Sequence, residues 1–595
     1  RNGGIWQAVY LERKPEIFTE KILVAPDTGT GRLTLRLFFV NTTGRRAEFP
    51  PEVELKGWCS FRYRREWPPE KFPLARLTIP AGRSEQTVSL QIKKPHLWSP
   101  AAPNLYHLIL RDRSTNTILG QERFGFRTFS AGKNSFLLNG KKIYLRGENY
   151  DCFGWSFCGY DPMHRQFGVL NRERKLEEML KNYLRAGYNI FRANGNLPLE
   201  LCFDIADEIG LLFTTDDNPD ITRISLENGR AVLSEGQKES IRQRCFTTFN
   251  HPAVVTGTSR NEAFEKQLIG TKFETCGWAP ILNAYYDEYR KWDTSRPRGS
   301  SSGRGWKGGD RIYMPAIETA KADYDICHPY VTNRKLKSAE TDSYAFSYRR
   351  FKDNYAREHG GAERVMLVGE SSEFYTFSPT AGGGPRIFRN RVRDFSPHIR
   401  NGEFDRNWLA KHLQIIQPEY LSEACEYSLI PLVESADVPE SLRIQAWHNR
   451  QIMEQFRRRR DVVAGYIMHM SGTFKDFTFG EYWPQTFAAA QMAQQPVLAC
   501  FSGFAPRNLL IGRTFSSELY LMNDSEQALE HPSVHITRNG DPHWRKQLSF
   551  PTLAPGEMKK VPVAFPIAGR SGDDKLFLTV FTRQKQVSRN EFEIF

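Results

Sequence analysis

The chain has 595 residues, of which 40% are hydrophobic, 13% aromatic and 25% charged. At roughly 100–200 residues per domain, this length predicts about three to five domains, each large enough to bury a core. The hydrophobic fraction excludes a disordered chain, and no uninterrupted apolar stretch reaches the roughly 20 residues of a transmembrane helix. We therefore expect several folded domains and no membrane span.

The net charge is +14, from 82 Lys and Arg against 68 Asp and Glu residues. An excess of basic residues of this size is compatible with binding to nucleic acid or to another anionic polymer, and also with a basic surface that binds neither. The densest basic run, Arg457 to Arg460, closes a helical pattern, where cations complement the helix dipole. Because no zinc-finger, RRM or basic-zipper pattern occurs, we expect no nucleic-acid partner. The nine cysteines include no CxxC pair and predict isolated thiols.

Residues 17–129 are dominated by alternation of apolar and polar side chains. The runs at 33–41, 86–92 and 104–112 have the period of two that is typical of strands, and turn-forming residues separate them. About 110 residues with this strand spacing predict an immunoglobulin-like β-sandwich.

From residue 130 the pattern changes to short apolar strands that alternate with longer amphipathic helices. Two of the helical patterns end at Gly187 and Gly210, and an apolar strand follows each. Other strand patterns lie at 142–149, 253–259, 364–370 and 462–470. Repeated βα units over 130–494 predict a (β/α)8 TIM barrel as the catalytic domain, and no dinucleotide fingerprint favours a doubly wound sheet. Residues 495–595 return to alternation and predict a second, C-terminal β-sandwich.

Acids that directly follow the predicted barrel strands are candidates for catalysis, because catalytic groups lie at the carboxyl ends of TIM-barrel strands. They are Glu148, Asp216, Asp217, Glu262 and Glu370. Two carboxyl groups can break a glycosidic bond, one protonating the leaving oxygen and the other attacking carbon or activating water. The tetrapeptide SRNE at 259–262 recurs at 588–591, where we expect a surface position. Only the first copy follows a helix and NHPAVVTGT, which favours the pair Glu262 and Glu370.

Several segments together resemble glycoside hydrolase family 2, the family of β-galactosidases, β-glucuronidases and β-mannosidases. They occur in family order: GIWQAVYLE (4–12), LWSPAAPNLYHL (97–108), RFGFRTF (123–129), FLLNGKKIYLRGEN (136–149), FDIADEIGLL (203–212) and NHPAVVTGTSRNE (250–262). The resemblance implies that residues 1–16 are the end of an N-terminal jelly-roll, sugar-binding domain. It also implies retaining chemistry through a covalent glycosyl-enzyme, with carboxyl groups about 5–5.5 Å apart.

By this resemblance Glu262 is the general acid/base, and its neighbour Asn261 hydrogen-bonds the sugar 2-hydroxyl. Glu370 is the expected nucleophile because it follows the apolar run VMLV and Gly369. Glu373 is the alternative nucleophile, since the Ser-Glu-Phe sequence at 372–374 also resembles a family motif. The acid needs a raised pKa, to which the like charge of the second carboxylate contributes.

The other candidates for substrate binding lie near strand ends or in segments that resemble the family's pocket: Arg146, Asn149, Arg192, His328, Tyr330, Trp155, Trp483 and His469. An arginine at such a position can hold the nucleophile ionised, and it can equally bridge neighbouring strands. A lone histidine is usually structural, and tryptophan usually packs in a core, so these residues also have structural interpretations.

The chain departs from the family pattern at three places. No histidine closely follows Arg192, and His469 lies near where the family has a tryptophan. The Asn-x-Lys motif of glucuronidases occurs at Asn333 to Lys335, after the sixth predicted strand instead of the eighth. These departures leave the sugar open.

We expect a retaining exo-β-glycosidase that hydrolyses terminal β-linked sugars of oligo- or polysaccharides, with a β-galactoside as the first expectation because that activity is frequent in the family. The basic balance keeps an anionic glycan among the candidate substrates. Water is the only second substrate, so we expect no cofactor and no metal. The alternative is a catalytically inactive relative that binds glycans. We favour a periplasmic or secreted location over a cytoplasmic one, and the oligomeric state stays open, a homo-oligomer included.

Overall fold

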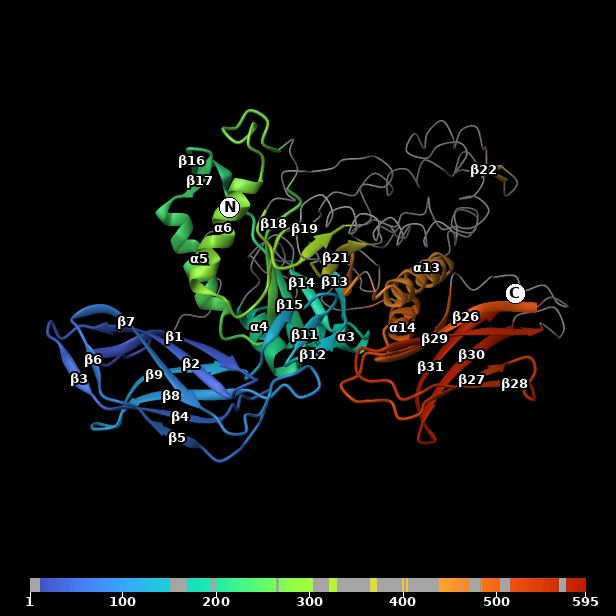
Figure 1. The fold of residues 1–595 in the computed structure, drawn as a ribbon, viewed down its shortest axis with the longest axis horizontal. Helices are drawn as coiled ribbons and strands as arrows, with labels where there is room; N and C mark the ends of the chain where they lie inside the picture. The colour runs from blue at the N-terminus through green and yellow to red at the C-terminus, as the bar shows by residue number, and fades with distance from the viewer. Residues whose placement is uncertain are drawn as a thin grey trace.

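The computed structural model describes residues 11–149, 168–193, 200–263, 267–302, 320–328, 364–371, 399–400, 403–404, 438–461, 463–469, 482, 484–502, 514–566 and 574–594. Within these ranges two antiparallel β-sandwiches lie on opposite sides of a central parallel barrel (Figure 1). Among the helices of these ranges, none combines the length and apolar character that a membrane crossing requires.

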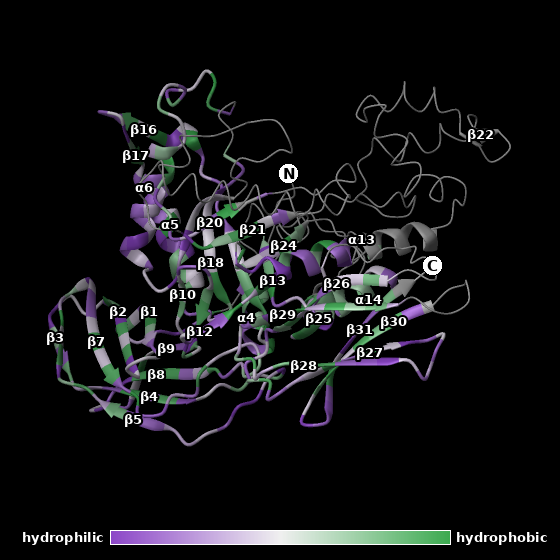
Figure 2. Ribbon diagram, turned by 45° about the vertical axis from the view of Figure 1, so that its right-hand side comes forward, coloured by the Kyte–Doolittle hydropathy of each residue, from purple (hydrophilic) through white to green (hydrophobic). Residues whose placement is uncertain are grey.

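The first sandwich is built from sheets of three and four strands that enclose one hydrophobic core. The three-stranded sheet contains β1 (Ile17–Asp27), β2 (Arg32–Asn41) and β7 (Gly82–Gln91). The facing sheet contains β5 (Glu70–Pro73), β4 (Pro51–Gly57), β8 (Tyr106–Asp112) and β9 (Thr117–Phe124), and a separate pair joins β3 (Ala47–Phe49) to β6 (Leu77–Ile79). Every second residue of β2 is buried, as the predicted alternation requires, and the strands change colour along their length in Figure 2.

The barrel has eight parallel strands, as the sequence predicts. They are β13 (Leu145–Asn149), β14 (Ile190–Ala193), β15 (Leu212–Asp216), β18 (Val254–Asn261), β19 (Arg298–Ser302), β20 (Asp325–Cys327), β21 (Met366–Ser371) and β24 (Gly465–His469). Consecutive barrel strands pair with each other except β19 and β20, which are the two edges of the nearly closed sheet, and the last strand, β24, pairs with the first, β13. The carboxyl ends of all eight strands therefore meet at one face.

Helices cover the barrel (Figure 1), and three of them lie where the sequence predicts them, before Gly187, before Gly210 and up to the arginine run at 457–460. The helices are α3 (Gly168–Arg185), α4 (Glu200–Ile209), α5 (Glu235–Thr248), α6 (Ala279–Trp292), α13 (Val438–Arg458), α14 (Pro484–Ala493) and the short η1 (Ile221–Arg223). Ser234 begins α5 with a capping box that includes Gln237. Gly187 and Gly210 follow α3 and α4 with positive φ, which confirms the predicted helix ends.

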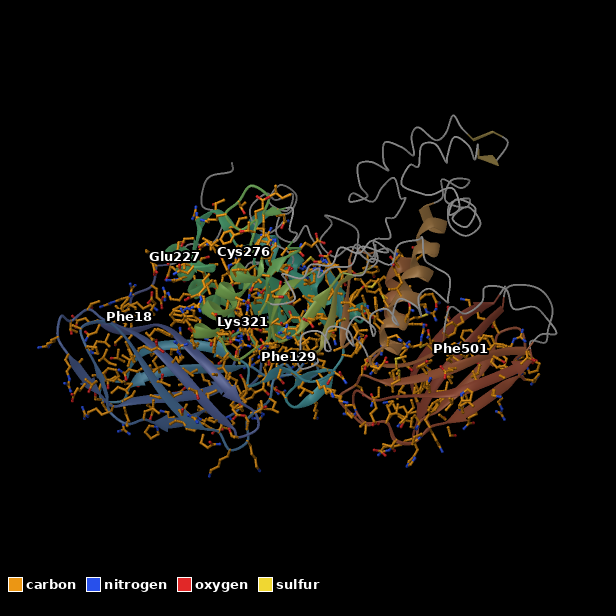
Figure 3. The ribbon with its side chains drawn as sticks, turned by 45° about the horizontal axis from the view of Figure 1, so that its top comes forward. Phe18, Phe129, Glu227, Cys276, Lys321 and Phe501 are labelled. Carbon is orange, nitrogen blue, oxygen red and sulfur yellow. The ribbon has the colours of Figure 1, made fainter. Side chains whose placement is uncertain are left out.

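The C-terminal sandwich has its own hydrophobic core, and Figure 3 marks Phe501 in it and Phe129 in the core of the barrel. Its sheets contain β25 (Val497–Phe501), β26 (Thr514–Asn523) and β29 (Met558–Pro566), and β28 (Arg545–Ser549), β27 (Ser533–Arg538), β30 (Asp574–Thr582) and β31 (Lys585–Ile594). The smaller sheets are β10 (Phe129–Ala131) with β11 (Phe136–Leu138) and β12 (Lys141–Ile143), β16 (Ile224–Glu227) with β17 (Arg230–Leu233), and β22 (Ile399–Arg400) with β23 (Glu403–Phe404).

The second SRNE copy, in β31, corrects one expectation. Ser588 and Asn590 are buried, and Asn590 donates a hydrogen bond to Glu454 of α13 at 3.1 Å. Only Arg589 of the four is exposed, because alternate residues of β31 face the junction with the barrel. The basic run at the end of α13 is also structural: Arg457 donates to the last carbonyl of α14, that of Ala493.

The junction between the first sandwich and the barrel is polar and largely buried. Arg123 of β9 donates hydrogen bonds to Asp204 and Asp207 of α4, the latter at 2.7 Å. His251 lies 2.6 Å from the same Asp207 oxygen. We call these four residues the junction cluster. All four lie in the sequence segments that resemble the family. Part of that resemblance therefore comes from residues that join two domains.

Candidate active site

Six barrel strands bring polar side chains together at their carboxyl ends. The residues are Asn149, Arg192, Asp216, Asn261, Glu262, His328 and Glu370, from β13, β14, β15, β18 and its following residue, the residue after β20, and β21. In a parallel barrel the carboxyl ends of the strands converge, so residues distant in sequence become neighbours. We call Arg192, Asp216, Glu262, His328 and Glu370 the site cluster.

Glu370 lies deep in this face, with a side chain that is 3% exposed. Arg192 Nη1 donates to Glu370 Oε1 at 2.6 Å, and Asn149 Nδ2 donates to the same oxygen at 3.3 Å. The preceding Gly369 is required by space, because a Cβ there would lie 2.6 Å from Cγ1 of Ile326. Two donors on one carboxylate oxygen stabilise the ionised form of Glu370.

Arg192 is fully buried and links four groups. Besides Glu370, it donates from Nη1 to the Gly369 carbonyl at 3.0 Å, and from Nη2 to Asp216 at 2.5 Å and to Asn261 Oδ1 at 2.8 Å. Burial alone would lower the pKa of Arg192, but the carboxylates of Asp216 and Glu370 raise it above its usual value. The guanidinium is therefore a permanent positive charge behind Glu370.

Asp216 is the partner that sequence reasoning placed among the strand-end acids but not in the site. Burial raises the pKa of Asp216, an effect that Arg192 opposes. The hydroxyl of Thr258 also donates to this carboxylate. The adjacent pair Asp216 and Asp217 was the sequence feature that could have indicated this role. Successive residues along a strand face opposite sides, so one acid of such a pair can face the site while the other faces away. Asp217 faces away and pairs with Arg298 at 2.6 Å.

Glu262 is the most exposed carboxylate of the site cluster, at 29% of its side chain. It follows β18 with φ +49°, a left-handed conformation that is uncommon for a residue with a side chain. His328 Nδ1 lies 3.2 Å from Glu262 Oε1 and 3.3 Å from Glu370 Oε2. The histidine thus stands between the two carboxylates, one buried and one open to solvent.

One oxygen of each glutamate and one ring nitrogen of His328 all lie within 4.8 Å of one another. Three such donors could hold a divalent cation. Arg192, however, already places a positive charge 2.6 Å from Glu370, which disfavours a cation at the same carboxylate. The arrangement therefore fits a catalytic pair of carboxyl groups, one ionised and one that exchanges a proton, better than it fits a metal centre.

Arg146 does not join the site. Its Nε donates weakly to the carbonyl of Gly187 at 3.4 Å, and Nη1 lies 3.5 Å from Asp524 of the C-terminal sandwich. Arg146 stands near the amino end of β13, whereas Asn149 ends that strand, so the two occupy opposite ends of the barrel. We therefore do not retain Arg146 as a substrate-binding candidate. Glu148, another strand-end acid, accepts a hydrogen bond from Tyr188 at 2.9 Å.

Of the remaining predicted residues, His469 lies in the described part of the chain. His469 ends β24 in register with Asn149, which puts its backbone at the same face of the barrel. The other predicted residues lie outside the described part of the chain: Tyr330, Trp155, Trp483 and the alternative nucleophile Glu373.

Comparison with known proteins adds an independent finding. Residues 22–127, essentially the first sandwich, match the family model described as glycosyl hydrolases family 2. A β-galactosidase of Priestia megaterium is 30% identical over 198 residues, which cover 30% of this chain and 18% of that relative. A putative β-glucuronidase of Formosa agariphila is 27% identical over 208 residues, covering 33% of this chain and 19% of the relative. The matched segments thus span about a fifth of these curated relatives.

Solved structures give the same fold over nearly the whole chain. A β-D-mannosidase from Dictyoglomus thermophilum superposes with a TM-score of 0.62 at 15% identity, covering 99% of this chain and 68% of that one. The exo-chitosanase CsxA of Amycolatopsis orientalis gives a TM-score of 0.57 at 15% identity, covering 98% of this chain and 64% of that one. At such identities the likeness concerns the fold.

Proposed function

This chain belongs to glycoside hydrolase family 2, and on that premise we propose that it is a retaining exo-β-glycosidase that removes terminal β-linked sugars by double displacement. The observation that carries the proposal is the convergence of Glu262 and Glu370 on His328, with Arg192 behind Glu370. The two carboxylates differ in burial and in partners, which is what distinct roles in one reaction require.

Glu370 is the proposed nucleophile. Hydrogen bonds from Arg192 and Asn149 favour its ionised form, and the 3% exposure keeps water from competing for its oxygens. In the first step a Glu370 oxygen forms a bond to the anomeric carbon as the bond from that carbon to the leaving oxygen breaks. The product is a covalent glycosyl-enzyme ester.

Glu262 is the proposed acid/base. It gives its proton to the leaving oxygen in the first step. In the second step it takes a proton from the water that attacks the anomeric carbon, while the bond from that carbon to Glu370 breaks and the Glu370 carboxylate leaves. The 29% exposure of its side chain supports this exchange with solvent. The approach of the two carboxylates, with oxygens within 4.8 Å, supports retention, because inverting enzymes need about 6.5–9.5 Å between carboxyl groups.

His328 and Asn261 are proposed as positioning and binding groups. The His328 ring nitrogen faces both carboxylates and fixes their separation. Asn261 is held through its amide oxygen by Arg192, which orients its side chain toward the hydroxyl next to the anomeric carbon. The sugar is proposed as a β-galactoside first, because a similar relative is named β-galactosidase. The net charge of +14 supports anionic glycans as a further group of substrates to test.

The test is a turnover screen on chromogenic β-glycosides of galactose, glucuronic acid, mannose, glucose, glucosamine and fucose. Glu262→Gln and Glu370→Gln should each lose activity on whichever sugar the wild type cleaves. Glu591→Gln is the matched control, because it makes the same change in the second SRNE copy, where Glu591 pairs with Lys575 at 2.9 Å. Unchanged rates in both site variants would contradict the assignment, and glycan binding without turnover in the wild type would favour the inactive relative.

A further inference from the structure

A cavity of about 660 Å³ lies at the end of the barrel opposite the site cluster. Its walls come from the end of α3 and the following turn, from α14 with the link to β25, and from Arg589 of β31. Arg146, near the amino end of β13, forms part of the floor. The cavity is thus shared between the barrel and the C-terminal sandwich, whose neighbouring elements are α14 and β31 (Figure 1).

The charged residues that line this cavity are all positive. Three arginines line it, Arg146, Arg185 and Arg589, and no carboxylate is among its lining residues. Within the described part of the chain, the Arg185 side chain donates a hydrogen bond to a neutral group, Asn182 Oδ1 at 2.9 Å, and to no carboxylate. Arg589 stacks over the ring of Phe577 at 4.0 Å. Two exposed guanidinium groups therefore face one cavity without an acidic partner among the described residues.

Arg146 adds a buried charge that is poorly compensated. It is 6% exposed, and its Nη1 makes no hydrogen bond in the described structure. Its carboxylate neighbour, Asp524 at 3.5 Å, already accepts from Arg457 at 2.8 Å and from Arg460 at 2.7 Å. Burial and the charge of Arg457 lower the pKa of Arg146 to about 10. An anion in the cavity would supply the missing counter-charge.

The walls are held in place before any ligand arrives. Gln491 of α14 donates to the carbonyl of Arg185 at 2.9 Å, and Gln495 donates to the carbonyl of Arg589 at 2.8 Å. These amides fasten the backbone at the two exposed arginines to the same helix and its following turn. A ligand that meets all three guanidinium groups would therefore bind with little rearrangement of the backbone.

We propose that this cavity binds a small molecule that carries a tetrahedral oxyanion, a phosphoryl or sulfate group. Three guanidinium groups from β13, α3 and β31 reach the cavity from different elements, and a tetrahedral anion offers oxygens in more directions than a planar carboxylate. The volume exceeds that of a bare ion and suits a sugar-sized ester. Binding here would tie the barrel to the C-terminal sandwich and stabilise the junction between them.

The experiment measures binding directly, by isothermal titration calorimetry of the full chain at constant ionic strength, with thermal unfolding in parallel. Sodium phosphate, sodium sulfate and glucose 6-phosphate are the probes, and sodium chloride is the reference. We expect saturable binding of at least one probe and a rise in Tm beyond that given by chloride. Binding of glucose 6-phosphate at least about tenfold tighter than phosphate would identify an ester as the ligand, and equal affinities would identify the free anion.

Arg185→Ala and Arg589→Ala are the informative variants, because both side chains are exposed and their loss leaves the buried network at Asp524 intact. Each should weaken binding at least about tenfold. Arg174→Ala, an exposed position on the same helix α3 that does not line the cavity, should bind as the wild type does. Absence of saturable binding, or equal affinities in all three variants, would overturn the proposal. Neither readout depends on glycoside hydrolysis.

Discussion

The site cluster and the junction cluster are made of the same kinds of residues. Each contains a largely buried arginine that binds two carboxylates, and each has a histidine against one of those carboxylates. In the junction cluster, Arg123 comes from the first sandwich and its acids from α4 of the barrel. In the site cluster every member comes from the barrel.

The acids nearest the two histidines, Asp207 and Glu262, differ in how completely they are enclosed. Asp207 is fully buried and accepts hydrogen bonds from Arg123 and from the backbone N–H of Ala253 at 2.9 Å, with His251 beside it. Glu262 of the site cluster faces solvent over 29% of its side chain and has a strained backbone. Asp207 thus serves the fold with both oxygens enclosed, whereas Glu262 stays partly open and can meet a substrate. Exposure alone does not mark a reactive acid, because Asp204 at the rim of the junction cluster is also 35% exposed.

The largest expected difference is between Glu370→Gln and Asp207→Asn. The first should lower kcat/KM at least about 10³-fold with a small change in Tm, because it removes the proposed nucleophile while keeping the shape of the side chain. The second should lower Tm and leave kcat of the folded enzyme little changed. Steady-state kinetics with differential scanning calorimetry separates the two. A loss of kcat in Asp207→Asn comparable to that of Glu370→Gln would remove the distinction between the clusters.

Replacement of the two arginines sharpens the same comparison. Arg192→Met and Arg123→Met each leave buried acids without their cation, which typically costs about 3–5 kcal/mol of stability. Only Arg192→Met should also lower kcat of the folded fraction, by about 10²-fold, because Arg192 keeps Glu370 ionised. Kinetics normalised to folded protein checks this, and equal kcat in the two variants would speak against a role for Arg192 beyond folding.

A smaller effect is expected from Gly369→Ala. The added Cβ would lie 2.6 Å from Ile326 Cγ1 and 3.1 Å from His328 Nε2, so β20 and the histidine must move. We expect kcat to fall about tenfold, since displaced catalytic groups lose activity steeply. Gly236→Ala is the control, because a Cβ there meets nothing within 4 Å and alanine favours helix α5. Full activity in Gly369→Ala would show that the spacing of β20 and β21 is not critical.

The smallest predicted effect concerns pH and the junction cluster. Burial alone would lower the pKa of His251, but Asp207 raises it above its usual 6.5. Protonated His251 therefore stabilises the fold fully below about pH 6.5, and this contribution is lost as pH rises through the raised pKa. The difference in Tm between wild type and His251→Asn should shrink as the pH rises from about 6 to about 9. A difference that grows with pH would contradict the assigned protonation.

Much of the architecture was predictable because it rests on periodicity. Alternation in β2 and helices that end at Gly187 and Gly210 fix local structure, and strand-end positions indicated Glu262 and Glu370. Arg192 and Asn149 came from the resemblance to the family. Side-chain direction at a strand end was not predictable. Arg146 and Asn590 show this: each faces a domain junction, which depends on how separate domains pack.

The site cluster also contains a residue that a sequence pattern alone could not select. Asp216 and Asp217 have the same type and adjacent positions, and only the direction of β15 decides that the first meets Arg192 and the second Arg298. Likewise, His251 is as close to an acid as His328 is, yet its partners belong to the docking of two domains. Residue type and spacing identify candidates, and the partners that each group meets in the fold separate the junction cluster from the proposed reactive one.

Trapping of the covalent intermediate tests the central claim most directly. The enzyme would be incubated with the 2-deoxy-2-fluoro β-glycosyl fluoride of the sugar that it cleaves, digested, and analysed by peptide mass spectrometry. The account predicts one glycosyl group per chain, attached to Glu370, with Glu262→Gln slowing both attachment and release. A label on Glu373 or on any other carboxylate, or turnover without any covalent intermediate, would contradict it.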